Sequence, residues 1–287
     1  MIRCAVAVLS VVVATSAVAQ TAADPGPDKS GYTLFDPTPD DQLRSFCTDR
    51  PTRSNLPCTV DAGHFQYEAD IVNWSYAHAD GVTTNTVLAP NPTLKLGLTN
   101  TIDFELSMAP WEMVTTRSAA GSQHLTGYGD MFFRTKINLA GAEGGDFQAA
   151  IIPYVKTPIA KSGIGDGATE GGAIAPVCFA LSSEWTLLFD PEIDILRNAN
   201  DYGRHANYQL LANLTRTFSD TVSGEVEIWG QANDDPAGPT KQASADFAVQ
   251  WLAHASHPEL QLDMGLNVGL TPSTPKAQPY IGISQRF

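Results

Sequence analysis

The chain has 287 residues, of which 43% are hydrophobic and 17% charged, and its formal net charge is −14. This composition is too apolar for a disordered chain, and the length suits one large domain. The acidic balance speaks against nucleic acid as a partner, because phosphate binding requires a basic surface.

Residues 1–19 have the features of a secretory signal peptide. Arg3 precedes an apolar run over residues 5–13, and the triplet Ala17-Val18-Ala19 predicts cleavage after Ala19. The run is too short to span a bilayer as a helix, and no later segment approaches the roughly 18 continuous apolar residues that a transmembrane helix needs. We therefore expect export without a helical membrane anchor.

Residues 20–62 form an irregular segment that is rich in proline, so we expect a loop with at most a short helical turn near residues 40–46. Cys47 and Cys58 lie close enough in sequence to form a disulfide in an oxidising compartment, with free thiols as the alternative. Cys178 has no evident partner. The segment either stays in the periplasm or fills the following domain as a plug, and the sequence leaves both open.

Residues 63–287 repeat one pattern, in which about ten residues alternate apolar with polar or small side chains before a turn. The clearest instance is residues 260–271, where Leu262 and Met264 alternate with Asp263 and Gly265. Twelve such segments can be counted. This period of two is typical of strands with two different faces.

The connections between these strands sort by length into two sets. With the first strand running outward, the outer connections are expected at about residues 77–92, 111–125, 157–171, 197–205, 232–241 and 271–278. The inner connections are expected at residues 99–100, 139–145, 182–184, 218–220 and 255–258. Longer outer connections are typical of transmembrane barrels, in which closure pairs every backbone amide within the hydrocarbon. The sequence therefore predicts an all-β, antiparallel up-and-down barrel of about twelve strands in a bacterial outer membrane, surrounded by lipid.

Short motifs along the chain carry a resemblance to a known family. They are Thr48-Asp49-Arg50-Pro51, Gly63-His64-Phe65-Gln66-Tyr67-Glu68, Gly127-Tyr128-Gly129-Asp130 and Tyr280-Ile281-Gly282-Ile283. These resemble a bacterial family of outer-membrane channel-like proteins assigned to the MetA pathway of phenol degradation. The resemblance implies a barrel that passes small or aromatic compounds. It also implies that barrel-assembly machinery recognises the last strand, residues 278–287, which ends on Phe287.

The polar faces of the strands are expected to line the lumen and to act as the selectivity element. The residues predicted for this role are Asp103, Glu105, Asp130, Arg134, Lys136, Asp190, Glu192, Asp194, Glu225, Glu227 and Asp263. Six more share these faces: Glu68, Asp70, Lys95, Lys156, Asp246 and Arg286. Together they comprise twelve acids and five bases. An acid-lined pore raises the local concentration of cations, which predicts passive diffusion of cations or neutral small solutes.

Two alternatives compete with this channel. Asp103 and Glu105 could instead face Lys136 and Arg134 as a structural ladder of charges, in a barrel that conducts nothing and serves as a structural or adhesive protein. A hydrolase is less favoured, because no Gly-x-Ser-x-Gly motif accompanies the histidines of the outer loops. No cofactor or metal is expected, since the pair His254 and His257 lies at an inner turn and the glycine-rich residues 163–167 lack the acidic density of a calcium loop.

Overall fold

The structure is a computed structural model that describes residues 28–256 and 258–287, so the predicted signal peptide and His257 lie outside the described residues. In this part of the chain no helix is both long enough and apolar enough to cross a membrane. The strands are β1 Phe65–Ala79, β2 Val82–Leu88, β3 Asn91–Thr99, β4 Ile102–Met108, β5 Glu112–Ser118, β6 Gly121–Gly127, β7 Met131–Ala140, β8 Phe147–Thr157, β9 Glu170–Ile174, β10 Val177–Ala180, β11 Trp185–Arg197, β12 Arg204–Ser219, β13 Val222–Asn233, β14 Thr240–His254, β15 Leu260–Gly269 and β16 Ala277–Arg286.

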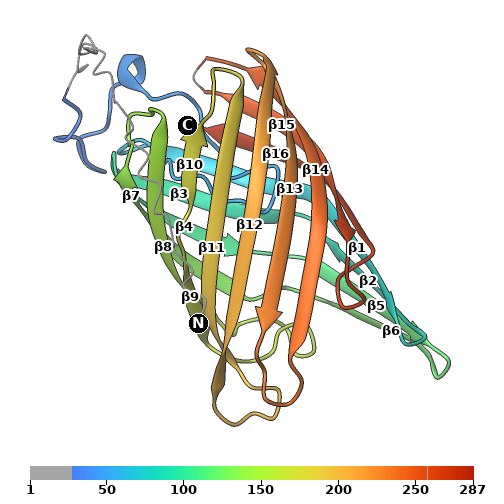
Figure 1. Ribbon diagram of the computed structural model, residues 1–287. Helices are drawn as coiled ribbons and strands as arrows, with labels where there is room; N and C mark the ends of the chain where they lie inside the picture. The colour runs from blue at the N-terminus through green and yellow to red at the C-terminus, as the bar shows by residue number, and fades with distance from the viewer. Residues whose placement is uncertain (1–27, 257) are drawn as a thin grey trace, which may run out of the picture.

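These strands form one antiparallel sheet that closes on itself where β16 pairs with β1 (Figure 1). Several of the sixteen segments are halves of a single interrupted strand. For example, β1 pairs with β3 along its first half and with β2 along its second half, while β9 and β10 both lie between β8 and β11. Joining β2 with β3, β4 with β5, β6 with β7 and β9 with β10 leaves twelve strands around the barrel. The predicted twelve-stranded up-and-down barrel is confirmed.

The first two outer connections differ from the expectation. Residues 77–92 and 111–125 were expected to be loops, but most of them continue as strands in two hairpins that project beyond the barrel wall (Figure 1). The first hairpin turns at Asp80 and Gly81, whose φ angles of 50° and 74° suit a two-residue turn between twisted strands. β2 then pairs with β5, and β5 with β6. The ordering of the connections by length was therefore wrong, because strand pairing extends further outward here than the membrane requires.

The outer face of the wall is apolar, as hydrocarbon requires. Val226 and Ile228 on β13 are exposed, whereas Glu227 between them is fully buried in the interior. Trp229 on the same strand points inward and packs with Leu188 in a small buried cluster. Its position follows from the period of two, since it shares the face of Glu227.

Replacing Ile228 with arginine should destabilise the barrel by about 2–4 kcal/mol, because the residue lies near the middle of β13 on the lipid face. Urea titration of the protein folded in vesicles measures this change. Arginine at the exposed Asp220, in an inner turn outside the wall, is the matched control and should leave the free energy of unfolding nearly unchanged.

The last strand closes the barrel at the periplasmic rim. The backbone N–H of Phe287 donates to the carbonyl of Phe65 at 2.7 Å, and the two aromatic rings lie 6.2 Å apart. The barrel is therefore closed next to its carboxy-terminal residue. Recognition of this strand by the barrel-assembly machinery stays a prediction.

The amino-terminal segment runs along the periplasmic end and then enters the barrel (Figure 1). Residues 28–45 lie at the rim, where Leu34 donates to the carbonyl of Leu98, and include a short 3-10 turn, η1 (Asp40–Gln42). Residues 46–60, which we call the plug, contact inward-facing side chains on both sides of the barrel, among them Lys136 on β7 and Asp263 on β15. The first part of the described segment therefore lies at the periplasmic rim and the second part plugs the lumen, so both placements that the sequence left open occur.

Candidate channel lumen and its plug

The plug is a loop whose two ends are held together at the periplasmic rim. Cys47 and Cys58 form a disulfide that spans 11 positions of sequence. Below it, the Arg44 guanidinium donates to the Asp61 carboxylate at 2.8 Å and to the carbonyl of Thr59 at 3.0 Å. These links close the base of the loop, so residues 48–57 are presented to the lumen as a compact tip.

One side of the tip is fixed by a buried cluster of charges. The Asp49 carboxylate accepts from Lys136 Nζ at 2.8 Å and from Lys95 Nζ at 2.5 Å, and Lys95 also lies 2.5 Å from Glu68. Burial alone would raise the pKa of Asp49, but the ammonium groups of Lys136 and Lys95 hold it below its ordinary value. Asp49 is therefore ionised and bridges two lysines of the barrel wall, which also lie near Glu68 and Glu105.

The other side of the tip is fixed by arginines of the plug and carboxylates of the wall. Arg50 donates to Asp263 on β15 and to Asp70 on β1, each at 2.7 Å. Arg53 donates to Asp246 on β14 at 3.1 Å, and its guanidinium lies 4.8 Å from the centre of the Trp229 ring. The plug thus supplies a carboxylate where the wall is basic and guanidinium groups where the wall is acidic.

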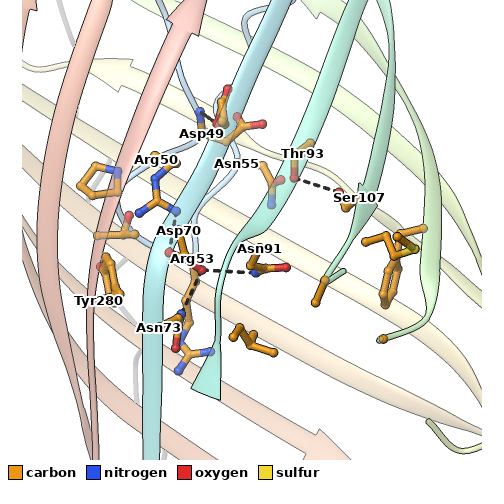
Figure 2. A pocket seen from close by; sticks show the side chains of 18 of the residues that line it. Asp49, Arg50, Arg53, Asn55, Asp70, Asn73, Asn91, Thr93, Ser107 and Tyr280 are labelled. Carbon is orange, nitrogen blue, oxygen red and sulfur yellow. Dashed lines mark hydrogen bonds and ion pairs between the residues drawn. The ribbon is translucent and has the colours of Figure 1, made fainter. Parts of the chain in front are cut away.

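A cavity of about 550 Å³ lies between the plug and the outer end of the barrel. Figure 2 shows Arg50, Asp70 and Tyr280 on one side of it and the bonded pair Thr93 and Ser107 on the other. Its remaining polar lining includes Asn73, Asn91, Glu112, Asp130, Arg134, Glu192 and Asn267. This polar chamber could hold a small hydrated solute.

The structure places seven of the eleven predicted selectivity residues against the plug or its charge cluster. These are Asp103, Glu105, Lys136, Asp190, Glu225, Glu227 and Asp263. Asp103, for example, accepts from the backbone N–H of Val60 at 2.9 Å, and Asp190 accepts from that of Asn55 at 2.8 Å. Their side chains therefore hold the plug in place, and their role in selectivity stays a prediction.

The other four lie outward of the plug. Asp130 is 3.5 Å from Lys156, and Asp194 accepts from the Tyr154 hydroxyl at 2.5 Å. Arg134 is the backbone partner of Glu105 across the sheet, but its Nη1 donates to Ser107 at 3.0 Å instead. Of the run Asp190, Glu192 and Asp194, Glu192 alone lines the outer cavity.

Sequence reasoning missed Asp49, Arg50 and Arg53 as lumen residues. One signal for them was available in the charge balance of the inner faces. Twelve acids against five bases leave a deficit of positive charge, which the two arginines of the proline-rich loop could reduce. The second signal was the pair Cys47 and Cys58, which form a disulfide and lie on either side of this charged stretch in the sequence.

The remaining candidates for chemistry have local partners. His78, His124 and His205 contact Thr83, Thr115 and Asn198 through ring nitrogens at 2.9 Å. Within residues 28–256 and 258–287, no group of three or more His, Cys, Asp or Glu side chains is arranged to hold a metal ion. Lys156 occupies the space among Asp130, Asp166 and Glu170 beside the glycine-rich loop.

Comparison with known proteins identifies the family. The family model described as "Putative MetA-pathway of phenol degradation" matches residues 48–287. No curated protein matches the chain by sequence. A crystal structure of an outer membrane channel from Pseudomonas putida F1 is similar in fold, with a TM-score of 0.55 and 15% sequence identity over 78% of this chain and 94% of that one. The NanC porin has a TM-score of 0.48 and 6% identity over 77% of this chain and 98% of that one. This similarity is too weak to be evidence for the fold.

The matched region begins at Thr48 within the plug and runs through all sixteen strand segments to Phe287. The family resemblance inferred from the short motifs is therefore confirmed. The apolar outer face and the closed sheet place the barrel in the outer membrane of a bacterium, in contact with its lipid. The chain belongs to the family described as "Putative MetA-pathway of phenol degradation", and it is a twelve-stranded outer-membrane β-barrel with a plugged lumen.

Proposed function

We propose that this protein is a passive outer-membrane channel for small solutes and that it is not an enzyme. The observation that carries the proposal is the polar cavity of about 550 Å³ that lies inside the closed wall, outward of the plug. A barrel that serves only as a scaffold has no need of a chamber lined by amide, hydroxyl and charged groups. The family description names phenol degradation, so small aromatic compounds are among the solutes that we expect to pass.

We further propose a preference for cations or neutral solutes. Nine charged residues line the cavity, and six of them have an ion-pair partner: Asp49, Arg50, Arg53, Glu68, Asp70 and Asp130. Among the described residues, Glu112, Glu192 and Arg134 have no oppositely charged group within 4.0 Å. Two carboxylates and one guanidinium therefore remain to act on a solute, and this excess of negative charge favours cations.

Planar-bilayer recording tests this proposal. Replacing Glu112 and Glu192 with glutamine should move the reversal potential in a salt gradient toward that of an unselective pore, because both carboxylates lie on the cavity wall. Replacing Glu184, an exposed acid at an inner turn, is the matched control and should leave selectivity unchanged. Anion preference in the parent protein would contradict the proposal.

A non-conducting structural barrel is the second candidate, and the plug favours it. Residues 46–60 bond to strands on both sides of the lumen, which is how a barrel of this size fills its interior. Recording from a variant that lacks residues 46–60 separates the two candidates. Conductance that appears only after this deletion, with no opening of the parent under any voltage, would favour the structural role.

A further inference from the structure

Three cavities follow one another through the barrel. The outer cavity and a cavity of about 180 Å³ share Asp49, Arg50 and Ser54 in their linings. The smaller cavity shares Phe46 and Cys47 with a third cavity of about 520 Å³ at the periplasmic end. Each neighbouring pair is thus separated only by a few plug residues that border both.

The middle cavity lies on one side of the plug. Its wall is made by β11 to β15, through Thr186, Leu188, Asn213, Thr215, Glu225, Gln250 and Gln261. Its plug side is made by residues 46–50, Ser54 and Leu56. Seven of its fourteen lining residues carry an amide or a hydroxyl, so it suits a small polar solute that exchanges hydrogen bonds with water for hydrogen bonds with the wall.

The opposite side of the plug is sealed by main chain. At Gly97 on β3, an added Cβ would overlap the carbonyl of Asp61, so the chain that leaves the plug lies directly on this strand. The backbone N–H of Val60 donates to Asp103 at 2.9 Å, and Asn138 on β7 donates to the carbonyl of Pro57 at 3.0 Å. Because main chain cannot swing aside without moving the whole loop, this side is closed while the plug is docked.

The barrier between the outer and middle cavities consists largely of side chains. Arg50 spans the gap to Asp70 and Asp263, with its guanidinium over Gly282, which has no side chain there. Thr52 donates to Glu225 at 2.8 Å beside it. Rotation of the Arg50 side chain, which breaks its ion pairs with Asp70 and Asp263, opens such a barrier without displacement of the loop.

We propose that solutes pass beside the docked plug, through the middle cavity along β11 to β15, and that Arg50 forms the gate between the outer and middle cavities. This proposal rests on the channel function proposed above. The volume of the middle cavity and its amide and hydroxyl lining assign the path to small polar solutes, neutral or cationic. The plug is then a selectivity element that stays in place during transport.

Cysteine modification during bilayer recording tests this path. Thr215→Cys and Gln250→Cys each place a thiol in the middle cavity, while Asn138→Cys places one on the sealed side under Pro57. In the part of the chain that the structure describes, Cys47 and Cys58 form a disulfide and Cys178 is buried, so these three leave the background unreactive. A small methanethiosulfonate with a trimethylammonium group should remove most of the current of the first two variants and leave that of Asn138→Cys unchanged.

The outcomes separate the path from the channel itself. A conducting parent in which Thr215→Cys and Gln250→Cys are both unaffected, with labelling shown by mass spectrometry, would overturn the path but keep the channel. Equal loss of current in all three variants would mean that the plug leaves the lumen, which also overturns the path. A parent that never conducts would overturn the proposed function and the path together. Electrophoresis without heating confirms that each variant is folded before it is recorded.

Discussion

Replacing Asp49 with alanine should release the plug and increase the time that the channel spends in high-conductance states. The change leaves Lys95 and Lys136 buried without the carboxylate that bridges them, and losing one partner of a buried ion pair costs about 3–5 kcal/mol. That cost corresponds to a shift of roughly two to four orders of magnitude in the equilibrium between docked and released plug. Bilayer recording measures the open states, and hydrogen exchange of the amides in residues 46–60 measures docking independently.

The matched control is Asp41→Ala, which removes an acid from the same segment but at the exposed rim. It should alter neither the current nor the exchange of the plug amides. If Asp49→Ala kept parental exchange rates in residues 46–60, the buried charge cluster would not be what holds the plug.

Removing the disulfide by the double change Cys47→Ser and Cys58→Ser should have the second largest effect. A cross-link that closes a loop of this length stabilises by about 3 kcal/mol, because it limits the conformations of the released loop. Both cysteines line the periplasmic cavity, so a reductant added from that side can reach them. We expect the parent to show more frequent large openings after reduction, and the double variant to show them without it.

Cys178→Ser provides the control for this experiment, since Cys178 is a free, buried cysteine on the barrel wall. This variant should respond to the reductant as the parent does. A parent whose openings are the same before and after complete reduction would show that the ion pairs alone keep the plug docked.

The faces of the strands could be predicted from the sequence because side chains alternate strictly along a strand. Asp103 pairs with Lys136 across the sheet, and Glu105 with Arg134, as their spacing suggested. The alternation says nothing about where a strand ends, however. It therefore left the outward extension of β1 and β2 unseen, although Asp80-Gly81 is a strong local signal for a hairpin.

The plug could not be derived in the same way. Its partners are remote, since Arg50 and Asp263 are 213 positions apart in sequence and no periodicity connects them. The excess of acids in the lumen was visible, but the choice between attracting solutes and binding the protein's own arginines depends on where a loop folds. For the same reason Lys136 was expected to face a wall carboxylate, whereas it bonds most closely to Asp49 of the plug.

The way in which the plug is fastened determines how it responds to mechanical load. Its two ends are joined by the links from Arg44 to Asp61 and from Cys47 to Cys58, and the chain before them lies along the rim. The rim contacts and these two links would therefore carry tension applied to the amino-terminal segment from the periplasm. Little of this tension would reach the tip at Arg50 and Arg53. We therefore expect the docked plug to resist tension from the amino-terminal side and to be released by loss of its ion pairs in the lumen.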